Sequence, residues 1–117
     1  MSTNYYLRTT LNGVVVGDLH LCKYTASKML FQAVRDKDEQ VTLGSTRQLH
    51  KLLDEVHTTE HMVVIDEYGR VIEVDDFREL IRTSKCVERP TEYLHGISPY
   101  RQWIDDDNYI WCDYEFC

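Results

Sequence analysis

Glycine is scarce in this chain: five glycines occur among 117 residues, and none belongs to a GxGxxG or P-loop pattern. Both patterns depend on glycine because a backbone without a Cβ lets amide groups approach a phosphate closely. The Gly-x-Ser-x-Gly turn that exposes a nucleophilic serine is also missing. We therefore expect neither a nucleotide-binding enzyme nor a serine hydrolase.

Positive charge and long apolar runs are lacking as well. The chain carries 13 basic and 20 acidic residues, a net charge of −7, whereas nonspecific binding to DNA or anionic membrane needs positive charge. No apolar run approaches the ~20 residues that span a bilayer, and Met1–Asn4 is not followed by an apolar signal core. These features predict a cytoplasmic protein with reduced thiols, no membrane association and no direct binding to nucleic acid.

Paired metal ligands are missing too. The four cysteines, Cys22, Cys86, Cys112 and Cys117, form no CxxC pair, although structural zinc sites usually show two tight ligand pairs. His20 and Cys22 are two residues apart, so they would share one face of a regular strand. We predict no cofactor and assign no metal ligand, but the sequence leaves open whether His20, Cys22, Cys112 or Cys117 bind a metal.

The first half of the chain predicts strands followed by a helix. Tyr5–Thr10 and Leu19–Tyr24 have strand composition, and the turn residues Asn12-Gly13 and then the return run Val14–Val16 lie between them. Met29–Val34 is a further candidate strand, and 35–44 reads as a charged loop. Ser45 and Gln48 have the spacing of a capping box, which predicts a helix behind Ser45.

A strand, a tight turn and a second helix follow. Met62–Ile65 is continuously apolar, the turn Asp66–Gly69 should place Gly69 at positive φ, and Glu73 should begin the next helix. The apolar spacing of both helices predicts one buried stripe against a sheet. That predicted core consists of Leu49, Leu52, Leu53, Val56, Phe77, Leu80 and Ile81.

The last third predicts a loop over 86–96, one helical turn over 98–104 and a turn at 105–108. Tyr109–Phe116 then alternates as a strand, with Ile110 and Cys112 facing inward and Tyr109 and Trp111 on the opposite face. Runs of strands with few crossovers favour an α+β fold, an antiparallel sheet with two main helices packed on one face. Residues 1–117 should form a single domain of this class.

Aromatic residues are concentrated near the C-terminus. Trp103, Tyr109 and Trp111 lie close to the acidic turn of Asp105, Asp106 and Asp107. Exposed aromatic side chains with an acidic rim are typical of a protein-binding surface, although large aromatic residues also fill cores. We therefore predict that Trp103, Asp105, Asp106, Asp107, Tyr109 and Trp111 bind a partner, and we assign no catalytic residue.

Two segments resemble a known family. Tyr5–Arg8 and the later run Ile65–Arg70, followed by an acidic helix start, resemble small uncharacterised proteins of tailed bacteriophages with a Tyr-Tyr-Leu-Arg start and an Asp-Glu-Tyr-Gly turn. This chain has Thr10–Val14 where the family has a Cys-Cys-Gly segment, and His20–Lys23 in place of a His-Ile-Gly-Lys strand. The resemblance implies a phage origin and the cytoplasm of an infected bacterium, without supplying an activity.

The leading functional hypothesis is a non-enzymatic phage accessory protein that binds and modulates a bacterial host protein, in host takeover or anti-defence. One alternative is an acidic mimic of nucleic acid, or an inhibitor of nucleic-acid machinery. Another is a small metal-dependent or cysteine enzyme. The sequence identifies neither the host partner nor the oligomeric state, and it is compatible with a homodimer.

Overall fold

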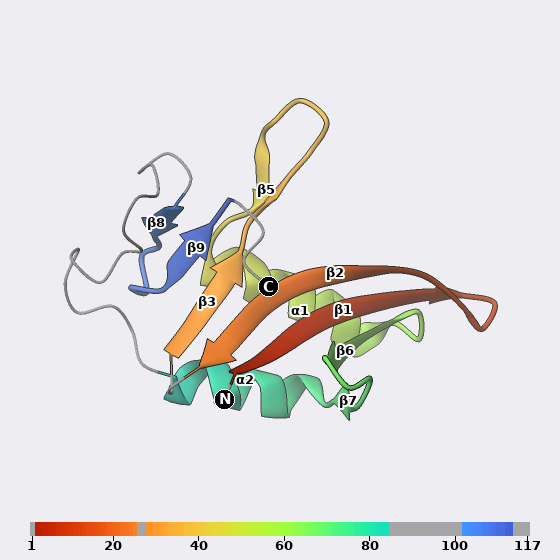
Figure 1. The fold of residues 1–117 in the computed structure, drawn as a ribbon. Coiled ribbons are helices and arrows are strands. Elements are labelled where there is room, and N and C mark those ends of the chain that lie inside the picture. The colour runs from red at the N-terminus through yellow and green to blue at the C-terminus, as the bar shows by residue number, and fades with distance from the viewer. Residues whose placement is uncertain (1, 26–27, 85–101, 114–117) are drawn as a thin grey trace.

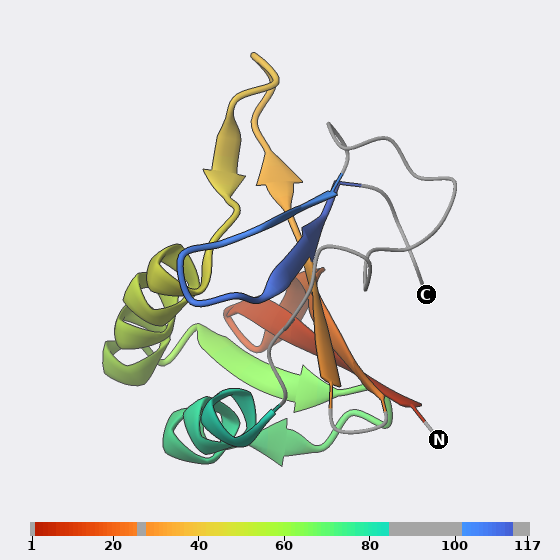
Figure 2. The ribbon, with the colours of Figure 1, turned by 90° about the vertical axis from the view of Figure 1, so that its left-hand side faces the viewer.

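A computed structural model describes residues 2–25, 28–84 and 102–113. Its main sheet has seven strands in the order β7-β6-β1-β2-β3-β9-β8 (Figure 1). These strands are β1 (Ser2–Leu11), β2 (Val14–Thr25), β3 (Lys28–Gln32), β6 (Met62–Asp66), β7 (Val71–Ile72), β8 (Gln102–Ile104) and β9 (Ile110–Cys112). Neighbouring strands are antiparallel except β3 and β9, which are parallel. The helices α1 (Thr46–Thr58) and α2 (Val74–Thr83) lie on one side of it (Figure 2), so the expected α+β fold is confirmed.

The hairpin of β1 and β2 is the longest element of the sheet. Asn12 and Gly13 both have positive φ, 52° and 79°, as the two-residue turn that joins twisted strands requires. The pairing shifts register twice, once between Tyr5 and Tyr6 and once between Thr9 and Thr10. Each shift inserts an extra residue into β2, a β-bulge that increases the local twist.

Helix α1 begins as its sequence predicts. The Ser45 side chain accepts a hydrogen bond from the Gln48 backbone N–H at 3.2 Å. The Gln48 side chain reaches back to the backbone N–H of Gly44, at 2.7 Å, one residue earlier than in the standard capping box. The first contact satisfies one of the backbone N–H groups that the start of the helix leaves without a helical partner, and the second holds the residue before the N-cap against the helix.

The turn between β6 and β7 is confirmed. Gly69 has φ of 83°, and its N–H donates to the Asp66 carbonyl at 3.1 Å. Glu73 is the N-cap of α2 but makes no side-chain cap. Asp75 and Asp76 instead place negative charge in the first turn, where it interacts favourably with the helix dipole.

The core lies between the helices and the sheet. Leu49, Leu53, Val56, Phe77 and Ile81 are buried as predicted. Two other positions of the predicted stripe, Leu52 and Leu80, are only partly buried and pack against the edge of this core. Each lies next to a fully buried position in its helix, so it turns toward the margin of the contact.

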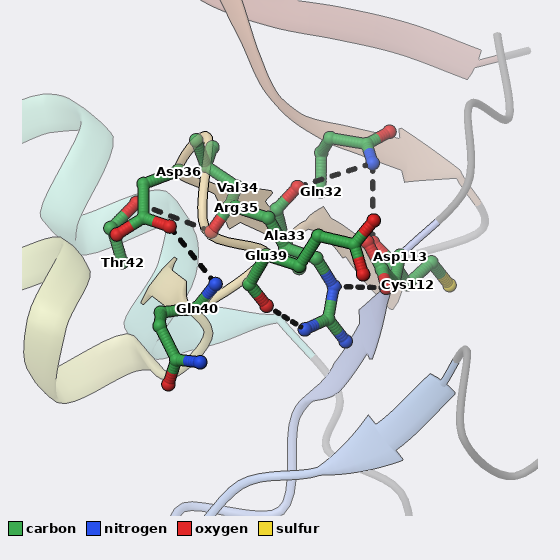
Figure 3. Close-up of polar contacts among 10 residues, drawn as sticks. All are labelled: Gln32, Ala33, Val34, Arg35, Asp36, Glu39, Gln40, Thr42, Cys112 and Asp113. Carbon is green, nitrogen blue, oxygen red and sulfur yellow. Dashed lines mark hydrogen bonds and ion pairs between the residues drawn. The ribbon is translucent and has the colours of Figure 1, made fainter.

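The charged segment 35–44 is not a plain loop. Strands β4 (Val34–Arg35) and β5 (Val41–Leu43) form a separate two-stranded sheet. The Asp36 carboxylate accepts hydrogen bonds from the backbone N–H groups of Asp38 and Gln40. Figure 3 shows the bond from Gln40, together with Arg35, which donates to the Glu39 carbonyl and pairs with Asp113. The polar residues of this segment therefore close a hairpin, which explains why their composition resembles that of a loop.

The C-terminal segment differs from the expectation in two ways. Gln102–Ile104 is strand β8, not part of a helical turn, because it pairs with β9; the rest of that expected turn and the expected loop over 86–96 lie outside the described residues. Strand β9 is also reversed: Trp111 belongs to the core beneath the helices, whereas Ile110 and Cys112 lie on the opposite face. Both sets are buried, so apolar alternation did not distinguish the two faces. Residues 114–117 of the expected strand are not described.

Candidate protein-interaction groove

The Asp105 carboxylate organises the acidic turn. Its Oδ1 accepts hydrogen bonds from the backbone N–H groups of Asp107 (2.9 Å) and Tyr109 (3.0 Å). Its Oδ2 accepts from the Thr46 backbone N–H at the start of α1 and from Nε1 of Trp111, both at 2.8 Å. Asp105 therefore joins β8, β9 and α1, and its oxygens are turned toward the protein itself.

Two of the predicted partner-binding aromatics are not accessible in this chain. Tyr109 is 7% exposed and Trp111 is fully buried, so the expectation that both would be exposed is wrong. Trp111 stacks on Phe31 with ring centroids 4.9 Å apart, and Tyr109 donates its hydroxyl proton to the Ile81 carbonyl at 2.7 Å. Their polar atoms are satisfied inside the protein, as buried tyrosine and tryptophan require.

Trp103 behaves differently. It is half-buried on β8, and its Nε1 donates to the Gly44 carbonyl at 2.8 Å. A Cβ added at Gly44 would approach the Trp103 ring to 3.0 Å, so glycine at this position lets the indole lie against the backbone. Trp103 thus secures the loop before α1 while keeping part of its ring accessible.

The remaining predicted residues meet the two helices at a groove of about 430 Å³. Asp107 and Tyr109 line it from the turn, His50 lines it from α1, and Asp75 and Arg78 line it from α2. Asp107 also accepts a hydrogen bond from the Thr46 hydroxyl at 2.8 Å, which fixes the turn against α1. Asp106 is exposed beside it. We call this concavity the acidic groove.

Internal pairing sets the charge of the acidic groove. Arg78 pairs with Asp54 and donates to the His50 carbonyl at 3.0 Å, and Arg82 pairs with Glu79. Among the described residues, Asp75 and Asp106 form no ion pair. The positive charges of the groove are therefore largely neutralised within the chain, whereas the carboxylates of Asp75 in the groove and Asp106 beside it remain available.

The surroundings of His50 favour its neutral form. Burial lowers the pKa of its imidazole and the positive charge of Arg78 lowers it further, which together outweigh the raising effect of Asp107 and Asp54. His50 therefore offers the groove a hydrogen-bonding ring whose positive form is disfavoured.

Metal binding and cysteine chemistry gain no support from the described residues. His20 pairs with Tyr6 and Cys22 with Tyr5, because Leu21 is the extra residue of a bulge. Neighbouring residues of β1 point to opposite faces, so His20 and Cys22 do not share a face as a regular strand would require. In residues 2–25, 28–84 and 102–113, no group of three His, Cys, Asp or Glu side chains could hold a metal ion.

The two described cysteines, Cys22 and Cys112, are buried. Burial raises the pKa of the Cys22 thiol far above its ordinary value, so this side chain is a neutral thiol rather than a nucleophilic thiolate. Cys86 and Cys117 lie outside the described residues.

Sequence reasoning assigned Asp107 and Tyr109 to the site but missed His50 and Asp75. Part of the signal was present, because Asp75 and Glu79, like Arg78 and Arg82, are four residues apart and mark a charged face of α2. The packing of α1 beside that face is not visible in the sequence.

No helix within the described segments is long and apolar enough to span a membrane. Comparisons with protein-family models, curated proteins and solved structures found no match to this chain.

Proposed function

We propose that this protein is a non-enzymatic accessory protein of a phage that binds and modulates a bacterial host protein in the cytoplasm. The observation that carries the proposal is the acidic groove, a concavity lined by Asp75, Asp107 and the buried Tyr109, with Asp106 exposed beside it. Its arginines are already paired. The likeness of the two sequence segments to tailed-phage proteins supports the host context.

The chemistry of the groove suits a basic segment of a folded partner. A lysine or arginine entering the groove would meet carboxylates from the turn and from the α2 start, while its aliphatic part would lie against Tyr109 and Ile81. Complementary charge accelerates encounter and selects the partner, and burial of the central contacts supplies affinity. The half-buried ring of Trp103 lies on the same C-terminal hairpin and offers an additional contact.

Asp75 and Asp76 provide a matched pair for testing this proposal. Both are exposed carboxylates in the first turn of α2, but only Asp75 lines the groove. The protein is immobilised, proteins captured from a bacterial lysate are identified by mass spectrometry, and each candidate is purified for calorimetric titration. Asp75→Lys should weaken binding by about tenfold or more, because it places like charge against a basic segment, while Asp76→Lys should bind as the wild type does.

Salt and competition experiments complete the test. Affinity should fall with ionic strength, since the rim charges are exposed. Equal effects of Asp75→Lys and Asp76→Lys, or the absence of any partner that binds in purified form, would contradict the proposed groove. If DNA competes with this protein for the purified partner, the nucleic-acid mimic replaces the leading proposal.

A further inference from the structure

The hairpin of β1 and β2 ends in an exposed apolar tip. Leu11, Val14, Val15 and Val16 are 58%, 63%, 49% and 60% exposed. Strand β6 pairs with β1 only over Tyr5–Thr9, so the tip extends beyond the other strands of the sheet (Figure 1). Four neighbouring apolar side chains in water are unusual for a surface without a partner, since such patches mark interaction sites. We call these four residues the apolar tip.

The same hairpin has an open edge. Strand β2 pairs with β1 over its whole length, but on its other side β3 pairs with it only at Cys22–Thr25. Among the described strands, none pairs with Val14–Leu19 on that side. An open edge presents unpaired backbone groups to another strand, and natural edges are usually protected by lysine or proline. Between Val14 and Leu19 this edge has no lysine and no proline, and its one charged residue, Asp18, pairs with Arg8 of the same hairpin.

An apolar pocket lies at the inner end of this edge. It has a volume of about 350 Å³ and is lined by Leu19 of β2, by Val34 and Leu43 of the β4–β5 hairpin, and by Leu52 of α1. Lys51 and Glu55 stand beside these apolar side chains. We call it the edge pocket. The open edge of β2 thus has exposed apolar side chains at one end and an apolar cavity at the other.

Val14 of the apolar tip and Leu19 of the edge pocket lie on the same face of the sheet. Val14 is opposite Leu11 and Leu19 is opposite Leu7. Leu7 and Leu11 are four residues apart on β1, so they point to the same face. Leu7 is buried in the core beneath the helices. Val14 and Leu19 therefore both belong to the helix-covered face.

We propose that a second copy of this chain covers the open edge, forming a two-fold dimer in which the two β2 strands pair antiparallel. A two-fold axis perpendicular to the sheet keeps the helix-covered faces on the same side and makes the contact isologous. Val14 of one copy then lies opposite Leu19 of the other, so the Val14 side chain of each copy covers the edge pocket of its neighbour. In this register the bulged residue Val16 lies opposite Gly17, which has no side chain to obstruct it.

The edge of β2 suits a second copy of this chain better than an unrelated strand. A two-fold contact between antiparallel strands needs a surface that is complementary to itself. The edge of β2 has the apolar tip at one end and the edge pocket near the other, so each end of one copy meets the opposite end of its neighbour. The chain has a net charge of −7, which opposes self-association in general. In the proposed register Asp18 lies opposite Val15 of the other copy, and its carboxylate is already paired with the Arg8 guanidinium of its own hairpin at 2.9 Å.

The first test measures the oligomeric state of the full chain by sedimentation equilibrium. The wild type should approach twice its mass of 13.9 kDa as concentration rises. Val14→Lys should raise the dissociation constant by about tenfold or more, because the dimer buries this side chain and a buried charge is costly. Val71→Lys is the matched control: Val71 is 62% exposed but lies on β7, a terminal strand of the sheet away from the proposed contact, so the variant should remain a dimer.

Circular dichroism should show that both variants stay folded, since both positions are exposed. A wild-type chain that remains monomeric at about 1 mM, or dissociation by Val71→Lys but not by Val14→Lys, would overturn the proposal.

The register of the two β2 strands has its own test. The double variant Val14→Cys with Leu19→Cys should form an intermolecular disulfide on oxidation, whereas the two positions of one strand are too far apart to bridge. Failure of the double variant to cross-link beyond the wild-type level would overturn the proposed pairing.

Discussion

The indole Nε1 of Trp111 donates a hydrogen bond to Oδ2 of Asp105 at 2.8 Å. The same oxygen accepts the backbone N–H of Thr46, so one carboxylate connects a buried core ring to the first turn of α1. A residue expected to form part of an exposed acidic rim is instead a structural junction between the C-terminal hairpin and the helical layer.

Asp105→Ala should therefore destabilise the fold. It removes all four hydrogen bonds of the carboxylate and leaves the buried Trp111 N–H without this partner. We expect a loss of about 2–4 kcal/mol in the free energy of unfolding, measured by urea denaturation. Asp106→Ala is the control: this neighbouring residue is exposed, and its replacement should change stability by less than about 0.5 kcal/mol. Similar losses in the two variants would show that Asp105 is not the junction.

Leu53→Ala tests the helical core. Leu53 is completely buried between α1 and the sheet, so truncation removes apolar contacts and leaves a cavity. The free energy of unfolding should fall by about 2–5 kcal/mol in chemical denaturation. Leu52→Ala, at a partly buried position beside the edge pocket, should cost less. A loss well under 1 kcal/mol at Leu53 would contradict the assignment of this position to the core.

Gly69→Ala isolates backbone strain. Gly69 has φ of 83°, and an added Cβ would meet nothing within 4 Å, so a substitution there costs conformational energy without a clash. We expect a loss of about 1–2 kcal/mol, seen as a lower midpoint of thermal unfolding. Gly17 also has open space for a Cβ but does not lie in the left-handed region. Gly17→Ala should thus be neutral or slightly stabilising, and an equal loss in both variants would rule out the conformational explanation.

Acid should weaken the turn that begins at Asp66. Burial raises the pKa of this carboxyl, but hydrogen bonds from the backbone N–H groups of Arg70 and Tyr68, with the Arg70 guanidinium, together lower it below its ordinary value. A carboxyl whose pKa is lower in the folded state stabilises the fold above its unfolded pKa of about 3.9, and this contribution is lost as pH falls through the folded pKa.

The check is the free energy of unfolding measured from pH 7 downward. Asp66→Asn cannot ionise, so it should start from a lower stability at neutral pH and lose less of it in acid than the wild type does. Parallel profiles for the two proteins would show that Asp66 does not contribute to the acid dependence.

Local chemistry in the sequence was sufficient for several elements. The Asn12–Gly13 turn, the Ser45 cap and the positive φ of Gly69 all follow from residues that interact within a few positions of one another. Helix periodicity likewise identified Leu49, Leu53 and Phe77 as core. The acidic turn at 105–108 was also predicted, because aspartate and asparagine stabilise turns through their own backbone neighbours.

The candidate site could be predicted only in part. Asp107 and Tyr109 do line the acidic groove, but His50 and Asp75 reach it from helices far away in the sequence. The predicted orientation of Trp111 was wrong because β9 is buried on both faces. Only the parallel pairing of β9 with β3 and the contact of Trp111 with Phe31 determine which side of β9 meets the helices.

Short-range features of the sequence account for the helices, the tight turns and the α+β class, because caps, turn residues and periodicity act over short stretches of chain. Packing between distant segments sets which strands are neighbours, places the bulge at Leu21 that separates His20 from Cys22, and leaves Val14–Leu19 of β2 beside an apolar pocket with no further partner among the described strands. These features depend on pairing and packing between distant segments, and no local pattern of residues encodes such contacts.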